Sequence, residues 1–178
     1  PFRLFAGNCV IQPPEIRHKV LYASDNIEVI EIGVPAEHVT TIDHDMELPT
    51  KEFNPEREFS GQKFVHNKAD EAKWSDFRIP GFTCRDTTIA KNTKNVAGVQ
   101  VIRPNGEAIK PTKHDCDILF NFVMEGKMTL AADGQPTNKL TAGDAFVIPP
   151  NLMTVYSNIS KDLELLEVSL PGVFKTNY

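Results

Sequence analysis

Short stretches in which apolar and polar residues alternate, or in which apolar residues run together, recur along this chain. Turn-forming clusters such as Pro104-Asn105-Gly106, Ala142-Gly143-Asp144 and Pro149-Pro150-Asn151 separate them. This spacing predicts an all-β protein, a sandwich or barrel of antiparallel strands. The strand-like stretches are Cys9–Gln12, Ile27–Ile32, Val99–Ile102, Ile118–Met124, Met128–Ala131, Ala145–Ile148 and Leu163–Val168.

Two other stretches lack this alternation. Asn67–Trp74 is short and polar and is the clearest helix-compatible stretch of the chain. Pro49–Gly61 carries charge and proline without any periodicity, so we interpret it as a linker.

The chain repeats itself at an offset of 136 residues, which places Gly7 on Gly143 and Pro13-Pro14 on Pro149-Pro150. The same register continues without a gap and matches Glu28, Glu31 and Pro35 with Glu164, Glu167 and Pro171. Two unrelated hairpins would share valine and leucine, but not proline, glycine and glutamate in one register. We interpret the repeat as a duplication.

The composition is that of a globular protein with a real core, since 40% of the 178 residues are hydrophobic and 24% are charged. A net charge of -5 leaves no basic stripe for phosphates, so nucleic acid is not expected as a partner. No apolar run approaches the roughly 18 to 20 residues that span a bilayer, and no membrane partner is expected. Three widely spaced cysteines without a CxxC pair argue against a disulfide framework, so we predict a cytoplasmic location.

The repeated segment resembles the second motif of the cupin family: Gly, five residues, Pro-x-Gly, two residues, His, three residues, Asn. Gly143, Pro149 and Asn158 match it, whereas Asn151 replaces the motif's glycine and Thr154 replaces its metal-binding histidine.

The first cupin motif, His-x-His, four residues, Glu, six residues, Gly, should lie upstream of the second. Counting back from Gly126 places Thr112 and His114 at the two histidine positions and Leu119 at the glutamate position. Only His114 matches.

The resemblance implies a cupin-type antiparallel jelly-roll β-barrel, one complete barrel plus the C-terminal half of a second. Residues 1–48 correspond to the closing half of a first lobe, residues 49–63 to a linker and residues 64–178 to a complete second lobe. Half a jelly roll exposes strand edges. We therefore expect that strands upstream of Pro1 complete the first lobe, or alternatively that another subunit or the second lobe covers the edge.

Cupin enzymes of this kind hold iron, manganese, nickel or zinc through three imidazoles and one carboxylate. The first copy retains the second-motif histidine as His18, so the resemblance implies a first-lobe metal site whose other ligands lie outside this chain. In the second lobe, Thr112, His114, Leu119 and Thr154 stand at the four ligand positions, and no metal is expected there.

A lone histidine on a strand is more often structural than catalytic, and this interpretation of His114 stands beside a functional one. In the functional interpretation, His114 is a general base in a metal-free pocket. The pocket residues expected around it are Thr112, Leu119, Asn121, Leu152, Thr154 and Tyr156.

The resemblance favours part of a metal-dependent, dioxygenase-like bicupin that acts on a small organic molecule and whose second lobe has lost its metal site. Two alternatives remain open. One is a non-catalytic cupin that binds or senses a small molecule, and the other is a metal-free isomerase or epimerase that uses His114. A homodimer is expected, because barrels of this family commonly pair through sheet edges.

Overall fold

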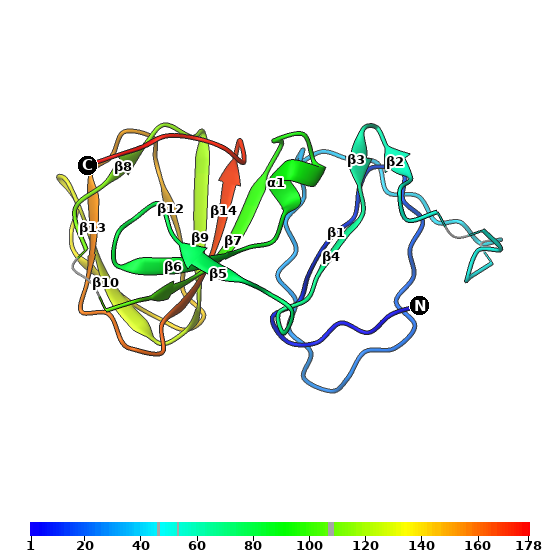
Figure 1. Cartoon of the computed structure of the whole chain (residues 1–178), viewed down its shortest axis with the longest axis horizontal. Coiled ribbons are helices and arrows are strands. Elements are labelled where there is room, and N and C mark those ends of the chain that lie inside the picture. Colours follow the sequence, from blue (N-terminus) through cyan, green and yellow to red (C-terminus); the bar gives the residue numbers. More distant parts are fainter. Residues whose placement is uncertain (46, 53, 107–108) are drawn as a thin grey trace.

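The computed structural model describes residues 1–45, 47–52, 54–106 and 109–178; Phe53 of the predicted linker lies outside the described residues. A β-barrel occupies one end of the molecule (Figure 1). Residues 1–67, which we call the N-terminal arm, lie at the other end. The fold is all-β, as the sequence predicts.

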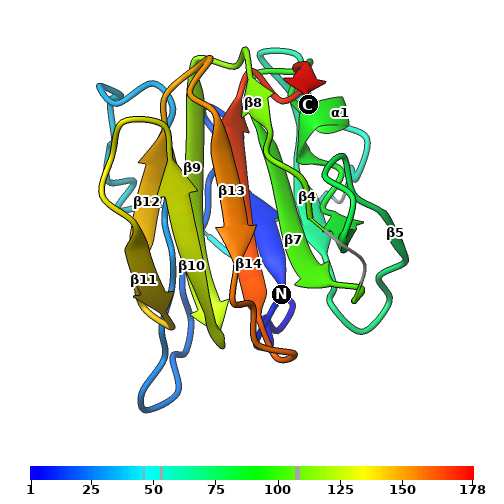
Figure 2. The same cartoon turned by 90° about the vertical axis from the view of Figure 1, so that its left-hand side faces the viewer.

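The barrel has two antiparallel walls. The larger wall has six strands in the order β12 (Ala145–Ile148), β9 (Ile118–Glu125), β14 (Glu164–Leu170), β7 (Gly98–Pro104), β6 (Phe82–Asp86) and β5 (Trp74–Asp76). Figure 2 shows the smaller wall in front of it, with the strands β11 (Asn138–Thr141), β10 (Lys127–Ala132) and β13 (Thr154–Ser157). A short pair, β8 (Lys113–His114) and β15 (Thr176–Asn177), lies at the end of the barrel that also holds the C-terminus.

Alternation along β9 decides which of its side chains enter the barrel, because successive residues of a strand face opposite sides. Leu119, Asn121 and Val123 are buried, whereas their neighbours are less so. On β14, Glu167 pairs with Asn121 and so faces the same interior. The apolar core around them contains Phe77, Ile79, Phe82, Cys84, Ile102, Cys116, Leu119, Val123, Met128, Leu130, Ile148, Tyr156, Leu163 and Leu165.

The turn from β9 to β10 depends on Gly126. Its φ of 78° lies in the left-handed region, and a Cβ at this position would lie 2.7 Å from the backbone nitrogen of Leu163. Only glycine therefore fits where the turn meets the chain that leads into β14.

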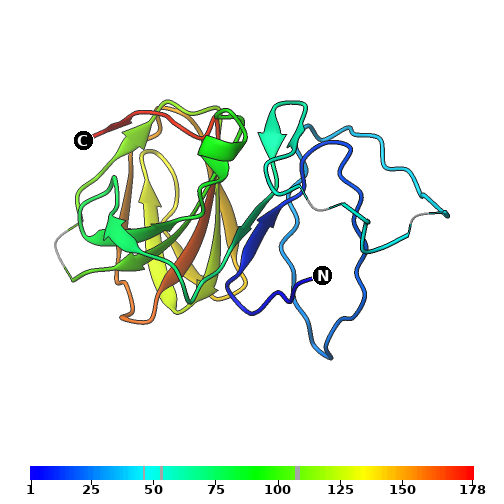
Figure 3. The ribbon, with the colours of Figure 1, turned by 45° about the vertical axis from the view of Figure 1, so that its right-hand side comes forward.

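The N-terminal arm is held to the barrel by one buried arginine. The arm forms two short hairpins, β1 (Cys9–Ile11) with β4 (Val65–Asn67) and β2 (Glu58–Phe59) with β3 (Gln62–Lys63). Arg85 of β6 donates to the Asn67 side chain at 2.9 Å and to the carbonyl of Gly7 at 2.7 Å. In Figure 3 the arm, blue to cyan, runs beside the barrel and extends away from it in long loops.

The strand expected over Ile27–Ile32 is absent, which corrects that prediction. Its repeat partner, residues 163–168, contributes to β14 because β7 and β9 lie on either side and complete its hydrogen bonds. Residues 27–32 have no such neighbouring strands in the described part of the chain. Many apolar side chains of the arm are exposed in consequence: Val20, Leu21, Tyr22, Ile27, Val29, Ile30, Ile32 and Val34.

The helix-compatible stretch Asn67–Trp74 forms no helix. Asn67 ends β4 and Trp74 begins β5, so strand pairing at both ends leaves only a turn between them. The one helix in the described ranges is α1 (Ile89–Asn92). No helix there is long and apolar enough to cross a membrane.

Candidate functional site

A row of polar side chains crosses the inner face of the larger wall. Cross-strand pairing places Asp86 beside Gln100, Gln100 beside Glu167, and Glu167 beside Asn121. Burial increases along the row, because Asp86 is exposed, Gln100 is half-buried, and Glu167 and Asn121 are buried. The row therefore leads from solvent into the centre of the barrel.

Asn121 ends this row without a partner. Its side chain is 0% exposed, and neither its amide oxygen nor its amide nitrogen makes a hydrogen bond within the described residues. A buried, unpaired amide costs about 1–3 kcal/mol. Such a group requires a functional or structural reason, and a polar group of a bound molecule is one.

Glu167 is paired with Arg78, which lies in the loop between β5 and β6. The side chain of Glu167 is 4% exposed and that of Arg78 is 20% exposed, and a guanidinium nitrogen donates to the carboxylate. Burial raises the pKa of Glu167, while the charge and hydrogen bond of Arg78 oppose this rise. Glu167 is therefore a buried carboxyl that is poised to exchange a proton above the usual range for glutamate.

Several contacts fix Arg78 in position. Its guanidinium lies 4.8 Å from the ring centres of both Phe77 and Phe174. It also donates to the hydroxyl of Thr176 at 2.9 Å, and the hydroxyl of Tyr178 donates to the Arg78 carbonyl at 2.5 Å. The C-terminal segment thus holds the arginine over the opening of the barrel.

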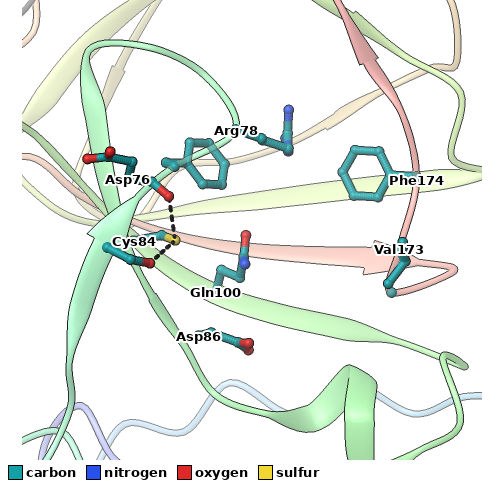
Figure 4. Close-up of a pocket in the computed structure, with 10 residues that line it drawn as sticks. Asp76, Arg78, Cys84, Asp86, Gln100, Val173 and Phe174 are labelled. Atoms are coloured by element: carbon teal, nitrogen blue, oxygen red, sulfur yellow. Dashed lines mark hydrogen bonds between the residues drawn. The ribbon is translucent and has the colours of Figure 1, made fainter.

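A pocket of about 300 Å³ opens beside Arg78 (Figure 4). Figure 4 shows Arg78 and Phe174 on one side of it and Asp86 on the other, with Gln100 between them. Its lining consists of Ser75, Asp76, Phe77, Arg78, Cys84, Asp86, Gln100, Gly172, Val173 and Phe174.

The charges around this pocket disfavour an anionic occupant. Arg78 is already paired with Glu167, and the remaining charged residues of the lining are Asp76 and Asp86. A carboxylate or phosphate would meet two exposed aspartates and no free cation of the lining. The lining suits a neutral molecule with hydroxyl or amide groups, or a cation.

His114 lies deeper in the barrel, with both ring nitrogens in hydrogen bonds. Nε2 lies 3.1 Å from the carbonyl of Ile148, and Nδ1 lies 2.9 Å from the sulfur of Cys116. The carbonyl can only accept, so Nε2 carries the proton and the Cys116 thiol donates to Nδ1. Burial, followed by the charge of Arg78, lowers the pKa of His114, and burial raises the pKa of Cys116 to about 11. Both groups are therefore neutral at pH 7.

The other predicted pocket residues also lie in the barrel. Thr112 and Thr154 form a backbone bridge in which each amide nitrogen donates to the other residue's carbonyl, with N to O distances of 2.8 and 2.9 Å. Leu119 and Tyr156 belong to the apolar core, and Leu152 packs against it. Burial, together with the charge of Glu167, raises the pKa of Tyr156, so its hydroxyl stays protonated.

The four positions where the cupin resemblance places metal ligands do not fit a metal ion. They supply one imidazole, His114, whose nitrogens are both engaged, and one alkyl side chain, Leu119. The hydroxyl of Thr154 donates to the Thr112 carbonyl at 3.3 Å. Neutral hydroxyls and an alkyl group cannot compensate the charge of a divalent ion.

His18, the metal ligand expected for the first lobe, lies in the N-terminal arm and not in the barrel. It is exposed, and its Nδ1 lies 3.3 Å from the carbonyl of Ile16. No group of three or more His, Cys, Asp or Glu side chains arranged to hold a metal ion occurs among the residues described.

Sequence reasoning missed Arg78, Gln100 and Glu167. One signal was available for Glu167, because Leu165, Glu167 and Ser169 share one face of a strand whose other residues are largely apolar. A glutamate on the core face of a strand indicates a buried charge that needs a partner. Nothing local to Arg78 identifies it as that partner.

Comparison with known proteins agrees with this architecture. The family model described as "Cupin domain" matches residues 98–169, from β7 to β14. The polyketide cyclase RemF from Streptomyces resistomycificus is similar in structure, with a TM-score of 0.51 and 19% identity over 62% of this chain and 81% of that chain. KdgF from Halomonas sp. gives a TM-score of 0.49 and 22% identity over 58% of this chain and 92% of that chain. At 19% identity the likeness to RemF is one of fold alone. Together with the match to the cupin family model, it confirms the cupin-type fold that the sequence predicts. The sequence matches no curated protein.

Proposed function

Because this chain belongs to the cupin superfamily, we propose that its barrel binds a small, neutral, polar organic molecule at the pocket beside Arg78, without a metal ion in that lobe. The observation that carries the proposal is Asn121, the buried and unpaired end of a polar row that begins in the pocket. Asp86 and Gln100 of this row line the pocket, and the ligand extends inward from them to supply hydrogen-bonding groups to Asn121.

The dimensions of the row suit such a ligand. Gln100 and Asn121 lie two strands apart, a separation of about 10 Å. This is the length of a molecule with one ring and a polar side group. The aromatic rings of Phe77 and Phe174 supply apolar contact at the same opening, and the net charge of the lining selects against anions.

Glu167 is the group in this row that can move a proton. Burial raises the pKa of this carboxyl, and the charge and hydrogen bond of Arg78 oppose the rise, so Glu167 is the acid or base that the row offers. If the bound molecule reacts, Glu167 can remove a proton from it or donate one to it, as an isomerase or epimerase reaction requires. The same chemistry at His114 requires the Cys116 thiol to turn away from Nδ1 first.

Ligand-dependent thermal stabilisation tests the binding proposal. The protein is screened in EDTA against neutral monosaccharides, polyols and phenolic glycosides, with acetate and phosphate as anionic probes. We expect a concentration-dependent rise in melting temperature with at least one neutral compound, and its loss in Gln100→Ala. The matched control is Gln135→Ala, which changes an exposed glutamine of a turn. No stabilisation by any neutral compound, or equal stabilisation of wild type and Gln100→Ala, would contradict the proposal.

A metal-dependent, dioxygenase-like bicupin is the second proposal, and the sequence repeat favours it. Here His18 is one ligand of a first-lobe metal, and the barrel described above is its metal-free second lobe. Iron, manganese, nickel and zinc are measured by mass spectrometry in wild type and in His18→Ala. A metal content that falls in the variant supports a role for His18, and equal contents remove it from the site.

A further inference from the structure

A second cavity, of about 250 Å³, lies between the N-terminal arm and the outer side of the larger wall. It is separate from the pocket beside Arg78, and no residue lines both. Ala6, Gly7 and Ala69 line it on the side of the arm and the turn that follows β4, and Trp74, Arg85, Arg103 and Glu164 line it on the barrel side.

Arg85 brings a buried positive charge to this cavity. The residue is 3% exposed, and none of the ion pairs among the described residues includes it. The partners of its terminal nitrogens are neutral, the Asn67 side chain and the Gly7 carbonyl. Burying an arginine without a carboxylate is costly, and burial lowers its pKa accordingly.

The other charges of the cavity compensate Arg85 only in part, because the charge of Glu164 opposes the lowering of its pKa but is shared with Arg103. Arg103 forms an ion pair with Glu164 at 2.6 Å and lies 4.3 Å above the ring of Trp74. Two arginines and one glutamate leave the lining with a net charge of +1. An anion with one or two negative charges would compensate the positive charge of this lining.

The shape of the cavity also suits a small ion. Three of the seven lining residues carry no side chain beyond Cβ, which leaves room beside the guanidinium of Arg85. A Cβ on Gly7 would lie 3.1 Å from the Cβ of Ala69 and 4.0 Å from Nη2 of Arg85. The arm thus approaches the arginine closely without covering the cavity with a long side chain.

We propose that this cavity binds a small oxyanion, the phosphate or carboxylate group of a ligand, between Arg85 and Arg103. The planar guanidinium matches the geometry of both oxyanions. Because Gly7 and Asn67 belong to the arm while Arg85 and Arg103 belong to the barrel, the bound anion strengthens the attachment of the arm. This site is independent of the proposed ligand pocket.

Trp74 provides the test, because it lines the cavity and is the single tryptophan of the chain. Its fluorescence is titrated with sodium phosphate and, separately, with sodium acetate, each against sodium chloride at equal ionic strength. We expect a saturable change that is half complete below about 10 mM for at least one oxyanion, and no saturable change with chloride. Phosphate alone identifies a phosphate-type site, and acetate alone identifies a carboxylate-type site. No saturation with either ion, or the same response to chloride, overturns the proposal.

Two variants extend the test. Glu164→Gln removes the one carboxylate of the lining, so phosphate or acetate should bind at least about threefold more tightly. This gain cannot arise from misfolding. Arg57→Gln changes an exposed arginine that lies over Phe59, away from the cavity, and should leave the titration unchanged. Unchanged or weaker binding in Glu164→Gln contradicts the assignment.

Discussion

The buried pair of Arg78 and Glu167 makes a sharp prediction about stability. Arg78→Met keeps a side chain of similar length, which can still contact the rings of Phe77 and Phe174, but removes the positive charge. The carboxylate of Glu167, whose side chain is 4% exposed, then has no ion-pair partner. The variant should therefore lose stability, and the loss should depend on whether Glu167 is ionised.

The magnitude follows from the burial of the two groups. Removing one partner of a fully buried ion pair costs about 3–5 kcal/mol. Because 20% of the Arg78 side chain is exposed, solvent reaches the pair from one side, and the lower figure, about 3 kcal/mol at pH 7, applies.

The pH dependence has a definite sign. Burial already raises the pKa of Glu167 in the folded protein, and the loss of Arg78 raises that pKa further. A carboxyl whose pKa is higher in the folded state than in the unfolded state favours folding most at low pH. That contribution is lost as pH rises from the unfolded value, about 4.3, through the folded one. The penalty of Arg78→Met should therefore be largest at neutral pH and should shrink at pH 5.

Urea unfolding at pH 7 and pH 5 measures this penalty in wild type, Arg78→Met, Glu167→Gln and the double variant. We expect the double variant to be more stable than the sum of the single effects by about 1.5 kcal/mol or more. Arg17→Met, which breaks the exposed pair with Asp43, is the control and should cost at most about 1 kcal/mol. A loss below about 1 kcal/mol in Arg78→Met at pH 7, or an equal loss at both pH values, would refute the reasoning.

Three further predictions concern single positions. Asn121→Leu removes the unpaired amide and should raise the free energy of unfolding by about 1–3 kcal/mol while abolishing ligand-dependent stabilisation; unfolding and thermal-shift measurements check both effects. Gly126→Ala should destabilise by at least about 2 kcal/mol more than Gly134→Ala in urea unfolding, because both have positive φ but nothing lies within 4 Å of a Cβ on Gly134. The Cys116 thiol, with a pKa of about 11, is about one part in a thousand thiolate at pH 8. It should react with a disulfide reagent only after urea is added.

The strands of the barrel could be predicted because the sequence pattern that identifies each strand is local. Alternation of apolar and polar residues located stretches such as Val99–Ile102 and Ala145–Ile148 on strands that the structure contains. The cupin motifs and the strand period placed Asn121 and Thr154 in the barrel, and both are buried there. In each case the information lies within a few residues of the position concerned.

The features that the sequence did not predict depend on contacts between distant parts of the chain. Residues 27–32 have the same apolar pattern as residues 163–168 and form no strand, because a strand also needs neighbours that complete its hydrogen bonds. Arg78 meets Glu167 across 89 residues of sequence, and it does so from a loop whose residues follow no periodicity. The sequence placed Asn121 inside the barrel but identified none of the residues that line the pocket beside Arg78, since the cation of this site comes from a loop outside the strands.

The exposed apolar side chains of the N-terminal arm also determine how the chain behaves at high concentration. Residues 27–34 are rich in isoleucine and valine and contain no proline, a composition that favours addition to the edge of another sheet. Self-association of the purified chain should therefore involve this segment and leave the core of the barrel folded. Replacing Val29 and Ile32 with lysine should keep the protein in solution at concentrations where the unmodified chain precipitates.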